Sequence, residues 1–174
     1  FLVPVIYPYF SVSKNPEVMK PVFSFIITVF FVSFSMAQED TPTDYLSAEF
    51  HKERREALRT KMPDNSVAVF FANAVRNRAN DVDYIYHQDP DFHYLTGYRE
   101  PHSVLVIFSE DQINADGKSF NELLYVQEKN PRAEQWTGYR LGAEGAKTKL
   151  GFEMAQDGKE FLDSGIDYTG FDKV

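Results

Sequence analysis

Apolar residues recur at helical spacing near the start of the part of the chain that we expect to fold. This pattern is carried by Leu46, Phe50, Ala57 and Leu58. The intervening charged run, residues 52–56, is typical of a solvent-exposed face. The spacing predicts an amphipathic helix that ends before Pro63, because the residue preceding a proline disfavours the helical conformation.

Three short runs rich in β-branched and aromatic residues predict buried strands. They lie at residues 66–72, 103–108 and 123–126. Residues 114–117 (NADG) have the composition of a hairpin turn. Two shorter helical patterns follow at residues 143–150 and 159–162. Together these elements predict an α/β fold in which a mixed β-sheet is flanked by helices.

A long uncharged apolar run, residues 21–38, follows Met19 and Lys20. A positive start, an apolar centre and small residues before Ala37 are typical of a secretory signal peptide, which we place at residues 19–37. Cleavage after Ala37 would leave Gln38 as the first residue of an exported, periplasmic or secreted protein. The alternative is an uncleaved membrane anchor, since the run is near the minimum length for a spanning helix.

The remaining N-terminal segments are not expected to belong to the folded domain. Residues 1–18 precede the more plausible start at Met19, and we interpret them as leader sequence. Residues 38–44 are polar and contain a proline, which is typical of a flexible linker. The folded domain is therefore expected to span residues 45–174.

Composition excludes several classes of function. The 174 residues include 43% hydrophobic positions, enough for a core, and no cysteine. The chain therefore has neither disulfides nor a thiolate metal site, and its four histidines are the only nitrogen ligands of that kind. A formal charge of −8 repels phosphate backbones, so no nucleic-acid partner is expected.

Residues 81–98 concentrate four aspartates, two histidines and five aromatic residues. Such side chains can bind metal ions or transfer protons. The simpler interpretation is that the aromatics pack and the aspartates are solvated turn residues around Pro90. His87 and His93 are six positions apart and do not share a helical face as an i, i+4 ligand pair does. We assign no catalytic or metal-ligating residue here.

Several ordered motifs resemble the N-terminal domain of Xaa-Pro aminopeptidases (aminopeptidase P). Residues 84–107, YIYHQDPDFHYLTGYREPHSVLVI, resemble the family's Y-L-T-G-[FY]-x-E-P segment and the strand that follows it. Residues 50–71 resemble its opening helix and first strand. Residues 130–142, NPRAEQWTGYRLG, resemble its A-E-x-W-x-G-x-R-x-G segment. The resemblance covers about residues 45–174.

This resemblance implies that catalysis takes place in a different domain of the enzyme. In the family, a C-terminal "pita-bread" domain removes an N-terminal residue that precedes proline. Two metal ions, usually manganese, are held there by two aspartates, one histidine and two glutamates. Because none of that ligand set lies in the chain, we expect it to stop before the catalytic domain and to be inactive alone. The N-terminal domain would help to build a homo-oligomer, a dimer or tetramer, and would narrow the cleft for peptides with proline second.

Two residues acquire candidate roles through the resemblance. Trp136 matches a tryptophan on a loop facing the catalytic cleft, where it helps to bind substrate; alternatively, this sole tryptophan anchors the core. Asp81 aligns with an aspartate that, in tetrameric members, reaches the active site of a neighbouring subunit; alternatively, it is a solvated loop carboxylate.

Two other functions remain open from the sequence. One is a stand-alone exported binding or assembly module without hydrolase activity, and the other is the N-terminal domain of a related prolidase or creatinase.

Overall fold

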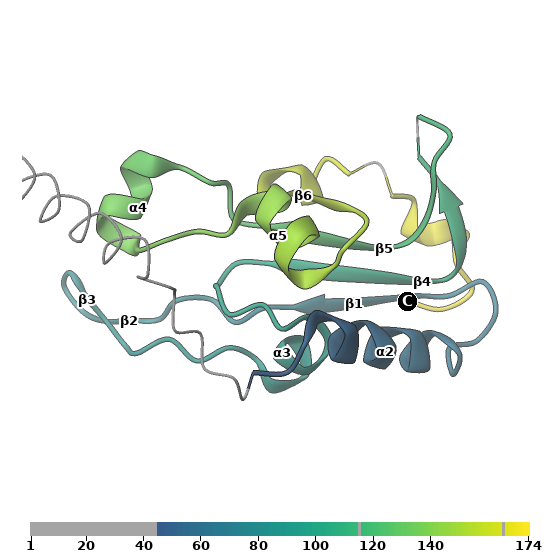
Figure 1. Cartoon of the computed structure of the whole chain (residues 1–174), viewed down its shortest axis with the longest axis horizontal. Coiled ribbons are helices and arrows are strands. Elements are labelled where there is room, and N and C mark those ends of the chain that lie inside the picture. Colours follow the sequence, from purple (N-terminus) through teal and green to yellow (C-terminus); the bar gives the residue numbers. More distant parts are fainter. Residues whose placement is uncertain (1–44, 115, 165) are drawn as a thin grey trace, which may run out of the picture. The chain divides into compact units, whose positions relative to one another are not determined.

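The computed structural model describes residues 45–114, 116–164 and 166–174 (Figure 1). The predicted leader, signal peptide and linker, residues 1–44, lie outside the described residues. Among the helices that the structure does describe, none has the length and apolar character needed to cross a membrane.

Four strands form the central sheet in the order β1-β4-β5-β6. β1 (Val67–Phe71) and β5 (Ser119–Val126) are both antiparallel to β4 (Val104–Ile113), whereas β6 (Ala155–Asp157) is parallel to β5. The three predicted strands are therefore confirmed, and the sheet is mixed as predicted. The short strand β6 was not predicted.

The predicted hairpin turn joins β4 to β5. The Asn114 side-chain oxygen accepts hydrogen bonds from the Asp116 and Lys118 amides at 3.0 and 2.8 Å. This arrangement stabilises the turn because the asparagine side chain replaces a backbone partner. Gly117 has φ +76°, a conformation that favours glycine.

Alternate residues of the strands face two different cores. Leu105, Ile107, Leu124 and Val126 pack on one face against residues of the helices α2 (Ala48–Arg59), α3 (Pro90–Thr96) and α5 (Gly142–Leu150). The other face carries Val67, Val106, Phe108, Leu123 and Tyr125. That face is covered by side chains from the C-terminal segment, namely Phe161, Ile166, Tyr168 and Phe171. Two short 3-10 helices lie in this segment, η1 (Gly158–Phe161) and η2 (Tyr168–Gly170).

Helix α2 forms where the apolar spacing predicts it, but its buried face differs from the prediction. Arg55 is 1% exposed, and its guanidinium donates to both carboxylate oxygens of Glu122 on β5, at 2.6 and 2.9 Å. It also donates to the Leu95 carbonyl at 2.9 Å and lies 4.0 Å from the centroid of the Phe152 ring. The prediction that residues 52–56 all face solvent is therefore wrong for Arg55. A buried charge is stable here because Glu122 supplies the countercharge.

The aspartate-rich block contains a helix rather than only turns. Asp89 caps α3 by accepting a hydrogen bond from the Phe92 amide at 2.9 Å, and Pro90 occupies the first turn. The prediction of solvated turn aspartates is therefore wrong for Asp89. Phe92 and Tyr98 are buried in the core, which confirms that these aromatics pack.

Candidate functional site

Two long connections emerge at one end of the sheet. β1 and β5 run parallel to each other on either side of β4, so both end where β4 begins. The segment after β1 contains the small hairpin β2 (Asn77–Ala79) and β3 (Val82–Asp83), and the segment after β5 contains α4 (Pro131–Thr137). Figure 1 shows the hairpin and α4 at this end, which we call the loop end. Both residues singled out from the sequence therefore lie at the loop end.

Asp81 lies in the exposed turn between β2 and β3. The preceding residue, Asn80, has φ +53°, in the left-handed region that asparagine adopts in tight turns. The Asn77 amide group holds the hairpin together by donating to the Asn80 carbonyl, the Val82 carbonyl and the Asp83 carboxylate, at 3.0, 3.3 and 3.2 Å. The turn therefore presents the Asp81 carboxylate to solvent.

Trp136 lies on α4 with 87% of its surface exposed. The alternative that it anchors the core is therefore wrong, and it lies on a helix rather than on a loop. Asn130 caps this helix by accepting from the amides of Arg132 and Ala133, both at 3.1 Å, and Glu134 accepts from the Asn130 amide at 3.1 Å. No residue of α4 is buried. The helix is therefore held by its caps and flanking segments and leaves the indole free to contact another molecule.

Both segments of the loop end carry exposed apolar side chains. They are Val75, Val82, Tyr84, Ile85, Trp136 and Tyr139. A cavity of about 460 Å³ lies at the base of the hairpin, lined in part by Tyr84, Ile85 and Tyr86. Exposed large apolar side chains concentrated in one region of a fold indicate a surface that could bind another molecule. The loop end is therefore the candidate functional site.

The two histidines of the aspartate-rich block lie apart from a common centre. His87 is exposed, whereas the His93 ring lies against His51, with their centroids 6.0 Å apart. Burial lowers the pKa of His93 below its ordinary value of 6.5, and the charges of Arg99 and His51 lower it further. Within residues 45–114, 116–164 and 166–174, no three histidine or carboxylate side chains converge in a way that could hold a metal ion.

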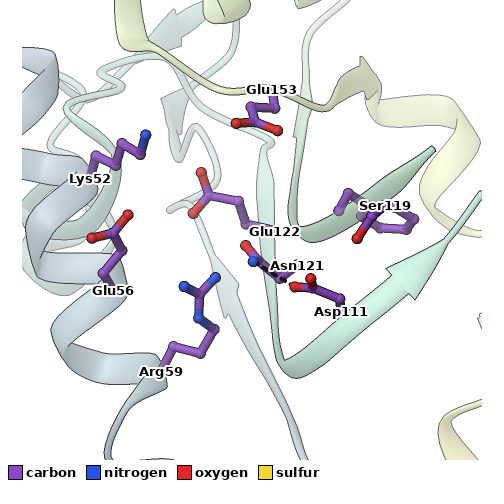
Figure 2. Close-up of a pocket in the computed structure, with 9 residues that line it drawn as sticks. Lys52, Glu56, Arg59, Asp111, Ser119, Asn121, Glu122 and Glu153 are labelled. Atoms are coloured by element: carbon purple, nitrogen blue, oxygen red, sulfur yellow. Dashed lines mark hydrogen bonds between the residues drawn. The ribbon is translucent and has the colours of Figure 1, made fainter.

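A second cavity, of about 320 Å³, is lined by charged and polar side chains between α2 and the β4–β5 hairpin (Figure 2). Lys52, Glu56 and Arg59 project from α2, opposite Glu122 and Asp111. Asp111 accepts a hydrogen bond from Asn121 at 2.9 Å, and Glu122 is the partner of the buried Arg55. The charges that line this cavity are of both signs and are partly neutralised within the fold. We therefore assign the cavity no chemistry.

Two half-buried polar residues behind the loop end carry no role predicted from the sequence. Gln88 and Glu100 belong to the motif that carries the family resemblance, and both accept or donate several hydrogen bonds beneath the exposed surface. The Tyr98 hydroxyl donates to Glu100 at 2.7 Å, and burial raises the pKa of Tyr98, with the Glu100 hydrogen bond adding to the rise. The available signal was the presence of polar residues in a strongly aromatic segment.

Comparison with known proteins identifies the family. A family model described as "Aminopeptidase P, N-terminal domain" matches residues 51–166. The Escherichia coli Xaa-Pro aminopeptidase is 36% identical over 110 residues, which cover 63% of this chain and 24% of that protein. Intermediate cleaving peptidase 55 of Schizosaccharomyces pombe is 36% identical over 115 residues, covering 66% of this chain and 23% of that protein.

Solved structures agree with the sequence relatives. The Pseudomonas aeruginosa aminopeptidase PepP superposes with a TM-score of 0.60 at 33% identity, covering 68% of this chain and 25% of the other. The E. coli aminopeptidase P with the inhibitor Pro-Leu gives 0.59 at 35% identity, covering 67% and 26%. This chain thus spans about a quarter of the length of the relatives it matches. The chain belongs to the aminopeptidase P family, and the part that the structure describes has the fold of that family's N-terminal domain.

Proposed function

We propose that this chain is the non-catalytic N-terminal part of an exported Xaa-Pro aminopeptidase, which removes an N-terminal residue that precedes proline. The observation that carries the proposal is the match of residues 51–166 to the aminopeptidase P N-terminal domain, joined to relatives named Xaa-Pro aminopeptidase. In this proposal the signal peptide at residues 19–37 directs the protein out of the cytoplasm.

The loop end would contribute to the substrate cleft. Trp136 offers a rigid indole face at 87% exposure, and a proline ring packs well on such a face. The cost of ordering the side chain on binding is small because a tryptophan side chain has only two rotatable bonds. Peptides with proline in the second position are therefore the proposed ligands of this surface.

The β2–β3 hairpin would serve the oligomer. Asp81 lies at its tip, and Val82, Tyr84 and Ile85 are exposed beside it, by 51%, 58% and 87%. Burying these side chains against a second copy would remove apolar surface from water. In a dimer or tetramer, such a contact would carry the Asp81 carboxylate toward the cleft of a neighbouring subunit.

The metal chemistry would lie elsewhere in the enzyme. The two proposed manganese ions activate water and polarise the peptide carbonyl when bound. The residues described for this chain do not fit such a site, since no three potential ligands converge among them. The ligands are therefore proposed to belong to the catalytic domain. The role of this chain is to bind and orient the peptide.

The test uses the protein expressed from its complete gene, including any coding sequence after Val174. Replacing Trp136 by leucine keeps apolar bulk and removes the flat face. We expect kcat/KM for an Xaa-Pro peptide to fall about tenfold, or about 1.4 kcal/mol of transition-state stabilisation, with little change in Tm. The matched control is Ile113→Ala, which changes a side chain 68% exposed at the opposite end of β4. Equal kinetics for W136L and the wild type would refute the cleft role.

A further inference from the structure

A chain of hydrogen bonds crosses the loop end beneath the exposed side chains. It begins just after β1 at Asn73. The backbone amide of Asn73 donates to the Gln88 side-chain oxygen at 3.1 Å. The amide group of Gln88 then donates to the Glu100 carbonyl at 2.9 Å. The Glu100 carboxylate in turn accepts from the Leu141 amide at 2.7 Å. The two connections that carry Asp81 and Trp136 are therefore joined through two side chains.

Gln88 fixes the first connection. Its side-chain oxygen accepts not only from Asn73 but also from the Tyr86 hydroxyl at 2.8 Å and the Asp89 amide at 2.9 Å. Burial raises the pKa of Tyr86 to about 12, so this hydroxyl remains a donor at neutral pH. The segments before and after the β2–β3 hairpin are thus held together at its base.

Glu100 fixes the second connection. One carboxylate oxygen accepts from the hydroxyl of Tyr98, a residue that is 2% exposed, at 2.7 Å. The other accepts from Leu141 at the start of α5, where the cap residue provides no side-chain hydrogen bond of its own. A carboxylate at a helix N-terminus is favoured by the helix dipole. The short distances are those of charge-assisted hydrogen bonds, which are roughly twice as strong as neutral ones.

Helix α4 is weakly packed against the rest of the domain. No residue of α4 is buried, and Gly138, which ends it, has φ +83° and empty space around its Cβ position. The helix therefore has little packing of its own to hold Trp136 in place. The Leu141 contact with Glu100 lies just after this weakly packed stretch.

We propose that Glu100 is a positioning residue that fixes the segment of Trp136 relative to the sheet and, through Gln88, to the segment of Asp81. Its consequence for substrate binding rests on the proposed function, but the positioning itself does not. The carboxylate accepts from a buried tyrosine on one side and, on the other, from the connection that carries the weakly packed α4.

The test exploits the fact that Trp136 is the only tryptophan. In the whole 174-residue chain, Glu100→Ala should speed amide exchange at Leu141 at least tenfold and lower the fluorescence anisotropy of Trp136. Glu100→Gln should give values between those of E100A and the wild type, because its amide oxygen can still accept from Leu141 and the tyrosine hydroxyl can reorient to accept from the amide group, whereas the charge assistance is lost. Exchange at Leu124 in the central strand should stay unchanged, which separates local loosening from unfolding.

The control is Glu144→Gln, which alters an exposed carboxylate on α5 whose ion-pair partner among the described residues is Lys147. If E100A unfolds the chain, Tyr98→Phe replaces it, since that change removes one of the two carboxylate contacts and should give an intermediate rise in Leu141 exchange. Wild-type exchange and anisotropy in the folded variant would overturn the proposal. Loosened α4 together with unchanged kinetics in W136L would leave the positioning role standing and refute the cleft function instead.

Discussion

The buried pair between Arg55 and Glu122 gives the sharpest prediction for stability. Arg55→Met keeps a long apolar stem but removes the two hydrogen bonds to Glu122 and the one to the Leu95 carbonyl. The Glu122 side chain, 13% exposed, then loses its countercharge. Removing one partner of a buried pair costs about 3–5 kcal/mol, because the remaining charge is left uncompensated.

The measurement is unfolding followed by far-ultraviolet circular dichroism, in urea for the free energy and on heating for Tm. Tryptophan emission is a poor probe here because Trp136 is already 87% exposed in the folded state. A loss of about 3 kcal/mol should lower Tm by roughly 10 °C in a chain of this size. Arg55→Met combined with Glu122→Leu should recover most of the loss, because an apolar pair of similar volume is often as stable as the ion pair.

The matched control is Arg54→Met at the neighbouring position. Arg54 pairs with Glu53 at 3.3 Å, and the two side chains are 36% and 56% exposed. An exposed pair contributes about 0–1 kcal/mol, so R54M should change the free energy of unfolding by no more than that. If R55M and R54M cost the same, the reasoning from the buried charge is refuted.

Three further predictions concern other parts of the chain. Gly97→Ala should cost about 2–3 kcal/mol in urea unfolding, because Gly97 has φ +68° and its added Cβ would lie 2.8 Å from the His51 ring; an unchanged midpoint would contradict that geometry. The depressed pKa of His93 should make stability fall as pH drops below about 6.5, where the unfolded chain binds the proton first. In His93→Gln the urea midpoint should change less between pH 7.5 and 5.5 than it does in the wild type, and an equally large change would refute this assignment. N-terminal sequencing of the exported protein should begin at Gln38, whereas intact residues 19–37 in the membrane fraction would exclude cleavage.

The strands could be predicted because their signal is local. Residues 66–72, 103–108 and 123–126 each combine β-branched and aromatic side chains over a short run, and a strand buried on both faces needs no other information. The turn at Asn114 was equally local. The family resemblance gave Trp136 and Asp81 their candidate roles, which stay predictions; both residues lie at one end of the sheet because β1 and β5 end there.

The features that could not be predicted depend on partners far away in the sequence. The burial of Arg55 could not follow from α2 alone, because its countercharge lies 67 positions away on β5. Strand β6 has only three residues and is defined by its parallel pairing with β5. Helix α3, by contrast, had a readable start signal in Asp89 and Pro90, which the aspartate-rich composition obscured.

The order of strands in the sheet has a consequence for how the chain folds. The β4–β5 hairpin closes through a short turn, so its contacts form at a small entropic cost. β1 must reach β4 across the intervening hairpin and α3, and α2 must bring Arg55 to a strand 67 positions away, so these steps wait for slower loop closures. The parallel bridge between Ser66 and Lys173 spans nearly the whole folded domain. We therefore expect this bridge to form last during folding and to open first in local unfolding.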